Sequence, residues 1–215
     1  MEVILSPRVF RCRECHHHYR DFVIDEKRFY QEYRERHEPY PVEIRRSFCF
    51  NLVGIISPLI NQSDSVLELG SGDGYFAKCL RGISDNVECC ELDDNLADNL
   101  KLMGFEVHNK HLLNLSDDLK FDVVVAIDVL EHIKDLQRFA EKFSKISKRL
   151  IIQVPVKRKI HQRYPFDGHY HYFSPESITK LFEEYYDVKV MIKETGKKTV
   201  ANNPEMIVVF DRRQE

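Results

Sequence analysis

The sequence lacks any apolar run long enough to cross a membrane, and its N-terminus lacks the apolar core of a signal peptide. Both absences argue against an embedded or secreted protein, so we expect a soluble, cytoplasmic protein with no membrane partner. Internal repeats and low-complexity tracts are also missing, which argues against a repeat architecture. Nothing in the sequence indicates an oligomeric state.

An excess of positive charge is absent as well, since the formal net charge is -3 at pH 7. Bulk electrostatics therefore gives no reason to expect a nucleic acid as partner. Modest basic runs do occur at residues 157–159 and 197–198. A solvated face is the ordinary explanation of such runs, and an acidic substrate is the alternative.

Cysteine is sparse, with 6 residues in 215, and a second Cys-x-x-Cys pair is missing. Cys12 and Cys15, with histidines at 16–18, form one arm of a zinc site, but a closed structural site needs four ligands. The alternative is a short hairpin with solvated histidines. Cys89 and Cys90 are adjacent and would point to opposite faces of a strand. We therefore expect core thiols in a reducing compartment rather than a disulfide framework.

The most informative stretch runs from residue 66 to residue 76. A short apolar run leads into a turn with glycine at every second position (Gly70, Gly72 and Gly74), and a helical pattern follows. This order gives a loop whose backbone N–H groups can lie against a ligand with no Cβ in the way. Carboxylates at Glu68 and Asp73 would repel a pyrophosphate and suit a ligand with an ammonium or sulfonium group.

A second acidic residue, Glu91, stands 17 positions after Gly74, near the end of the next apolar run. An acid at a strand end can accept hydrogen bonds from both hydroxyl groups of a ribose. A nucleoside that carries a cation and no phosphate points to S-adenosyl-L-methionine as the cofactor.

The glycine loop, Glu91 and the Asp-Val-Leu-Glu-His motif at residues 128–132 together resemble the class I S-adenosylmethionine-dependent methyltransferases. The motif is similar to that of the small-molecule O-methyltransferase branch, and the resemblance covers residues 45–212. It implies a transferase that binds its cofactor through Glu68, Gly70, Ser71, Gly72, Gly74, Glu91, Leu92 and Asp128.

Position 111 departs from the family pattern. The family usually carries an aspartate after the third strand, where it accepts a hydrogen bond from the adenine amino group, and His111 stands there. A neutral imidazole has one acceptor nitrogen, so the contact depends on the tautomer. Backbone contacts from Leu112 are the alternative.

The order of elements predicts the fold. Apolar strands alternate with amphipathic helices, and the last two strands, residues 187–193 and 205–211, face each other across a Gly-Lys-Lys connection. We predict an α/β fold with a doubly wound, mainly parallel seven-stranded sheet that ends in an antiparallel hairpin. This is the Rossmann-like fold that the resemblance implies.

We divide the chain into three parts: an N-terminal cysteine/histidine arm (1–24), a helical segment (25–60) and a methyltransferase domain (61–215). Helical periodicity within residues 25–37 and 44–56 supports the middle part. In the family such a segment covers the cofactor cleft.

Methyl transfer from a sulfonium depends above all on positioning, and it needs a base when the acceptor is a hydroxyl. His132 and His169 are our candidate catalytic bases. We predict O-methylation of a small metabolite or sugar, so the partner is a small molecule or a glycan. The alternatives are an RNA-end methyltransferase with a divalent metal and a non-catalytic methyltransferase-like binding domain.

A metal site is the other use of the same motif. Asp128, Glu131 and His132 would share one face of a helix and could bind a divalent cation, with His169 or His171 as a further ligand. A similar constellation binds metal in methyltransferases of ubiquinone biosynthesis and of small-RNA 3′ ends. Because many metal-free relatives carry the same motif, we predict no metal ligands here.

Overall fold

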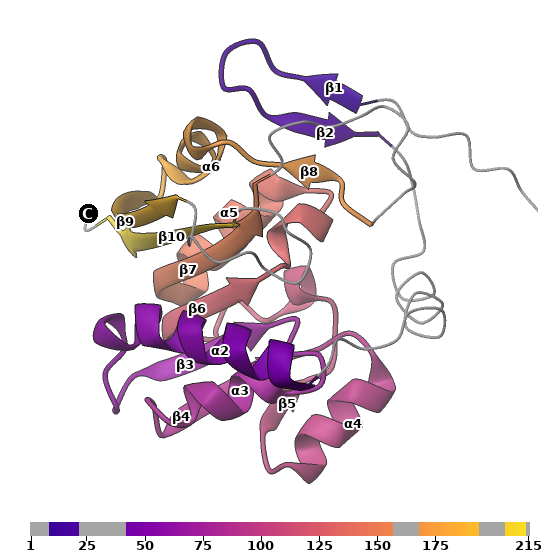
Figure 1. Ribbon diagram of the computed structural model, residues 1–215, viewed down its shortest axis with the longest axis vertical. Coiled ribbons are helices and arrows are strands. Elements are labelled where there is room, and N and C mark those ends of the chain that lie inside the picture. The colour runs from indigo at the N-terminus through magenta and orange to yellow at the C-terminus, as the bar shows by residue number, and fades with distance from the viewer. Residues whose placement is uncertain (1–8, 22–41, 157–167, 194–204, 214–215) are drawn as a thin grey trace, which may run out of the picture.

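The computed structural model describes residues 9–21, 42–156, 168–193 and 205–213 (Figure 1). At its centre is a seven-stranded sheet with the order β5-β4-β3-β6-β7-β10-β9. Neighbours among β3 to β7 pair in parallel, whereas β10 is antiparallel to both β7 and β9. The predicted doubly wound sheet with an antiparallel end is confirmed. The strands are β3 (Ser65–Leu69), β4 (Asn86–Cys90), β5 (Glu106–His108), β6 (Phe121–Ile127), β7 (Ser147–Pro155), β9 (Tyr186–Lys193) and β10 (Glu205–Arg212).

The central strands are buried on both faces, which is why they are continuous apolar runs rather than alternating patterns. In β6, Val123 and Val125 belong to the hydrophobic core on one side of the sheet. Val124 and Ala126 belong to the core on the other side. Because β3, β4 and β6 run in parallel, their carboxyl ends meet at one edge of the sheet, and the glycine loop begins there.

Helices cover both faces of this sheet (Figure 1). Leu52 and Phe76, from α2 and α3, lie in the core on one face, while Phe139 and Phe182, from α5 and α6, lie in the core on the other. The periodic apolar residues of each helix thus face the sheet, as amphipathic helices require. The helices are α2 (Val42–Ile56), α3 (Tyr75–Leu80), α4 (Asp94–Leu102), α5 (Leu136–Ile146) and α6 (Pro175–Phe182).

Side-chain caps fix the starts of two helices. The Asp93 side chain accepts a hydrogen bond from the Leu96 N–H at 3.0 Å and so begins α4. Ser174 accepts from the Ser177 N–H at 3.1 Å, and Pro175 follows it at the first helical position. The helix predicted within residues 25–37 lies outside the described residues.

A second, three-stranded sheet with the order β1-β2-β8 lies at the upper end in Figure 1. It joins β1 (Val9–Arg11) and β2 (His18–Arg20) to β8 (His171–Tyr172), and all its pairings are antiparallel. The cysteine/histidine segment therefore forms the short hairpin considered from sequence, and β8 fixes it to the rest of the chain. No helix in the described part of the chain is long and apolar enough to span a membrane.

Candidate active site

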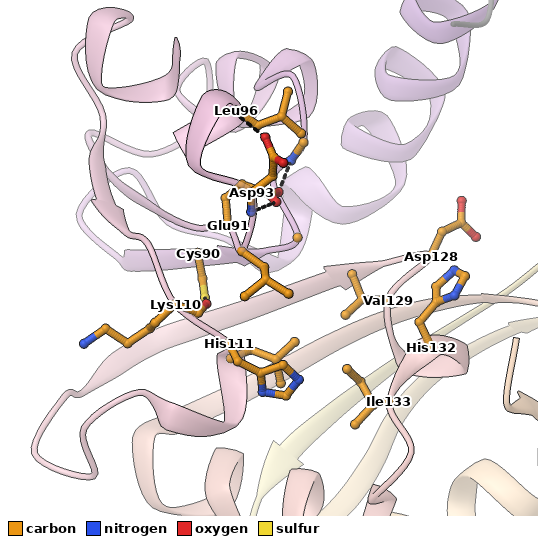
Figure 2. Close-up of a pocket in the computed structure, with 14 residues that line it drawn as sticks. Cys90, Glu91, Asp93, Leu96, Lys110, His111, Asp128, Val129, His132 and Ile133 are labelled. Atoms are coloured by element: carbon orange, nitrogen blue, oxygen red, sulfur yellow. Dashed lines mark hydrogen bonds between the residues drawn. The ribbon is translucent and has the colours of Figure 1, made fainter. Parts of the chain in front are cut away.

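A cavity of about 320 Å³ opens at the carboxyl ends of the parallel strands. Figure 2 shows Glu91 and Asp93 on one wall and Asp128 and His132 on the opposite wall, while the side chain of Lys110 extends away from them. The lining is mostly apolar, with carboxylates and two histidines interspersed. It consists of Gly70, Gly72, Cys90, Glu91, Leu92, Asp93, Leu96, Lys110, His111, Leu112, Asp128, Val129, His132 and Ile133.

The glycine loop forms part of this wall because its backbone takes conformations that side chains disfavour. Gly70 has φ 65° and Gly72 has φ 54°, both in the left-handed region. A Cβ on Gly70 would lie 2.8 Å from Cγ2 of Val129, closer than atoms pack, whereas the nearest atom to a Cβ on Gly72 is 4.0 Å away. The loop is thus packed tightly against Val129 at Gly70 and open to the cavity at Gly72.

Glu91 connects the glycine loop to the turn that precedes α4. Its Oε2 accepts a hydrogen bond from the Gly72 N–H at 2.8 Å, and its Oε1 accepts from the Asp93 N–H at 2.9 Å. Each carboxylate oxygen has a further lone pair, so hydroxyl donors of a ligand can still bind. Glu91 therefore holds the cavity wall in shape and also presents acceptors to the cavity.

Glu68, Ser71 and Gly74 do not line the cavity. Glu68 is 3% exposed, and burial, reinforced by the charge of Glu91, raises its pKa to about 8. The Ser71 hydroxyl donates to the Glu68 backbone carbonyl at 3.2 Å. Gly74 packs against Leu100 of α4. These three residues support the loop from behind, and a carboxyl buried there is suited to a cationic group placed close to it.

His111 caps a short 3-10 helix, η2 (Leu112–Asn114). Its Nδ1 accepts a hydrogen bond from the Leu113 N–H at 3.2 Å, so in the neutral ring the proton is on Nε2. The ring therefore offers a donor where the family's aspartate offers an acceptor. With this tautomer His111 can donate to a purine ring nitrogen but cannot accept from an exocyclic amino group.

The predicted helix beginning near Asp128 is wrong. Asp128 has φ 51°, and its N–H donates to the side-chain and backbone oxygens of Gln153, at 3.0 and 3.2 Å. Only a 3-10 turn follows, η3 (Leu130–His132), whose N-cap is Val129. The Gln153 contacts hold the backbone of Asp128 in the left-handed region, and no α-helix begins there. Its side chain is open to the cavity, and partial desolvation by the surrounding protein raises the pKa of its carboxyl.

The structure brings three of the predicted polar residues together beside the cavity. One ligand atom from each of Glu131, His132 and His169 lies within 4.8 Å of the other two. Asp128 is not a member of this cluster. His171 is turned away, because its Nδ1 lies 3.0 Å from Nε2 of His17 and its Nε2 lies 3.3 Å from the carbonyl oxygen of Lys134.

The proton position on His132 follows from its contact. Nδ1 lies 3.0 Å from the carbonyl oxygen of Gly168, and a carbonyl can only accept, so Nδ1 carries a proton. In the neutral ring Nε2 is then the basic nitrogen. The His169 ring stands edge-on to His132, with 4.6 Å between the ring centroids. The two predicted bases are thus neighbours, although only His132 lines the cavity.

Several cavity residues were not predicted as site residues. Leu96, Val129 and Ile133 supply apolar walls, and Cys90 and Lys110 also line the cavity. Apolar residues in helical or strand patterns are ordinarily predicted to lie in the hydrophobic core, so no sequence signal marked these residues as part of a site. Asp93 caps α4 and also lines the cavity wall.

Comparison with known proteins identifies a family and a fold that agree with this site. A family model described as "Methyltransferase domain" matches residues 42–185. No curated protein matches the sequence.

Solved structures with the same fold are numerous. The N-methyltransferase NodS from Bradyrhizobium japonicum WM9, in complex with S-adenosyl-L-homocysteine, has a TM-score of 0.66 at 14% identity, covering 87% of this chain and 100% of that one. A "possible histamine N-methyltransferase" from Thermotoga maritima has a TM-score of 0.62 at 17% identity, covering 87% and 97%. At these identities the likeness shows a shared fold.

Proposed function

The chain belongs to the methyltransferase-domain family, and we propose that it methylates a hydroxyl group of a small metabolite or sugar. It is an S-adenosylmethionine-dependent methyltransferase, and S-adenosyl-L-methionine is its cofactor. The family match favours an enzyme over a non-catalytic binding domain.

We propose that the cofactor spans the cavity from Glu91 toward Asp128. Glu91 receives the ribose hydroxyls on its remaining lone pairs, and the Nε2–H of His111 donates to the adenine ring. Asp128 acts on the cationic methionyl end, and Glu68 supports the glycine loop from behind. The position of Glu91 and Asp128 on opposite walls supports this orientation (Figure 2). Backbone N–H groups of the glycine loop need no charge to hold such a ligand.

The observation that carries O-methylation is the tautomer of His132. A hydroxyl group is a weak nucleophile, and a base that takes its proton accelerates attack on the methyl carbon. The Gly168 carbonyl fixes the proton on Nδ1 and leaves Nε2 basic, and His132 lines the cavity. The methyl–sulfur bond breaks as the oxygen–methyl bond forms, and the hydroxyl proton passes to Nε2.

The first test is an acceptor screen read by mass spectrometry, using pairs of small molecules that differ only in carrying a hydroxyl or an amino group. We expect methylation of hydroxyl members, with the rate falling about 100-fold in His132→Gln, in line with the usual contribution of a general base. His108→Gln is the matched control, because His108 is half-buried on β5 and outside the cavity. Methylation of amines alone, or an active His132→Gln, would contradict the proposal.

A second candidate function rests on the cluster of Glu131, His132 and His169. Their ligand atoms, within 4.8 Å of one another, and the basic Nε2 of His132 fit a divalent cation. Such an ion would bind an acceptor's hydroxyls directly, as in a methyltransferase of RNA 3′ ends. When bound, the ion would polarise the acceptor hydroxyl and replace the base.

Metal analysis separates the two candidates. If His132 acts as a base, the purified enzyme contains no stoichiometric divalent metal and EDTA leaves its rate unchanged. A stoichiometric ion that is lost in His169→Ala, together with methylation of an RNA oligonucleotide that depends on added Mg²⁺ or Mn²⁺, would favour the second candidate.

A further inference from the structure

The hairpin of β1 and β2 carries a site that the methyl-transfer reaction does not use. Cys12 and Cys15 stand three positions apart in the turn between the two paired strands, and both are half-buried free cysteines. Thiolates are the form that binds metal.

The turn is held in shape before any ligand binds. The Cys12 N–H donates to the His17 carbonyl at 2.8 Å and closes the turn, and His16 takes the left-handed conformation with φ 57°. The Ser174 hydroxyl donates to the Cys15 carbonyl at 2.7 Å, which ties the turn to the start of α6. The two cysteines therefore lie on a turn, residues 12–17, that backbone and side-chain hydrogen bonds hold in place; we call this turn the knuckle.

The neighbouring residues His16 and His17 both contact other side chains, since Nδ1 of His16 lies 2.9 Å from the Arg11 guanidinium. His17 packs against Phe173, with ring centroids 5.1 Å apart, and its Nε2 lies 3.0 Å from Nδ1 of His171. In the described part of the chain, no cluster of three ligand atoms within 4.8 Å includes either cysteine. Cys49, Cys89 and Cys90 are buried in the core, and Cys79 is on α3. Two thiolates thus meet one half of the requirement of a tetrahedral zinc ion.

We propose that Cys12 and Cys15 bind zinc together with the same two cysteines of a second copy of this chain, giving a four-thiolate site on a twofold axis. A twofold axis presents the same patch twice, so two half-sites make one complete tetrahedron. The inference goes beyond the proposed function and does not depend on it.

The surface around the knuckle fits a second copy. Phe10 and Tyr19 stack on each other with ring centroids 5.0 Å apart, yet they are 40% and 43% exposed. An exposed aromatic pair beside a half-site gives the contact an apolar component. Arg11 and Arg13 are exposed on the same hairpin and supply positive charge near a zinc–tetrathiolate centre of net charge about −2.

The test uses the full chain under reducing conditions, loaded with zinc sulfate and measured by metal analysis and light scattering. We expect one zinc per two chains and a mass that doubles from 25.5 kDa on loading. Cobalt chloride in place of zinc should give the intense thiolate-to-metal absorption of a four-sulfur site. Both signals should disappear with EDTA and in Cys12→Ser/Cys15→Ser, while Cys79→Ser on α3 keeps them.

A separate variant addresses the contact without touching the ligands. Phe10→Ser/Tyr19→Ser should raise the dimer dissociation constant at least tenfold. At high protein concentration the variant should still bind one zinc per two chains. No bound zinc, one zinc per chain at the monomer mass, or zinc retained by the double serine variant would overturn the proposal. None of these readouts requires methyl transfer.

Discussion

At the level of single residues, the buried carboxyl of Glu68 makes stability depend on pH. Its pKa of about 8 in the folded chain exceeds the ordinary 4.5, so the native state keeps a proton that the unfolded chain releases. The contribution of Glu68 to stability is therefore full below pH 4.5 and is lost as pH rises to 8. A rise of this size corresponds to about 5 kcal/mol, and we expect a loss of roughly 3–5 kcal/mol across this range.

Glu68→Gln removes this titration, so its free energy of unfolding should lack the decline from pH 5 to pH 8. Denaturant unfolding at several pH values measures it. Glu106→Gln, at an exposed position of β5, is the matched control and should follow the wild type. Parallel curves for the wild type and Glu68→Gln would contradict the prediction.

Glu91 has a structural and a binding role that one substitution tests together. In Glu91→Gln an amide N–H₂ replaces one of the oxygens that accept from Gly72 and Asp93, so one backbone donor is left without its acceptor. We expect a loss of about 1–3 kcal/mol in stability. We also expect at least a tenfold weaker binding of S-adenosyl-L-homocysteine by calorimetry. Unchanged affinity would remove Glu91 from the ribose site.

At the level of elements, two glycines give a matched comparison. Gly70→Ala places a Cβ 2.8 Å from Val129 in a left-handed conformation, while Gly54→Ala, in α2, meets nothing within 4 Å. The first should lower stability by about 1–3 kcal/mol and weaken cofactor binding. The second should raise stability by roughly 0.5–1 kcal/mol, since alanine favours a helix. Thermal unfolding of both variants measures the contrast, and equal effects would contradict it.

The motif at residues 128–132 shows that helical spacing in the sequence need not produce a helix. Its spacing suits a helix, but the backbone N–H of Asp128 is bonded to Gln153 of the neighbouring strand β7. Glu131, His132 and His169 then gather around a 3-10 turn instead of a helix face. A contact between two strands that are distant in the sequence decided the local structure, and no local pattern encodes such a contact.

For the whole molecule, cofactor binding should stabilise the fold by mass action. At a ligand concentration 100 times the dissociation constant, the gain is about 2.7 kcal/mol, which for a chain of this size raises Tm by roughly 5–10 °C. Scanning fluorimetry with S-adenosyl-L-homocysteine measures the shift. Adenosine diphosphate is the control and should give a smaller shift, because Glu91, Asp93 and Asp128 repel phosphates. No shift at saturating ligand would contradict cofactor binding at this cavity.

The sequence by itself determined the order of strands and helices, the glycine loop, the helix caps and the antiparallel end of the sheet. Each of these depends on neighbouring residues: apolar runs form buried strands, glycine permits the turn, and Asp93 or Ser174 satisfies the first N–H groups of a helix. The cofactor class followed from the same local motifs.

Only the tertiary structure decided which polar residues share a site. It joined His169 to Glu131 and His132, turned His171 toward His17, and set the tautomers of His111 and His132 through the Leu113 N–H and the Gly168 carbonyl. It also fixed the hairpin by pairing β2 with β8. These are contacts between segments far apart in the chain or fixed by backbone geometry, and their energies depend on where the whole fold places each donor and acceptor.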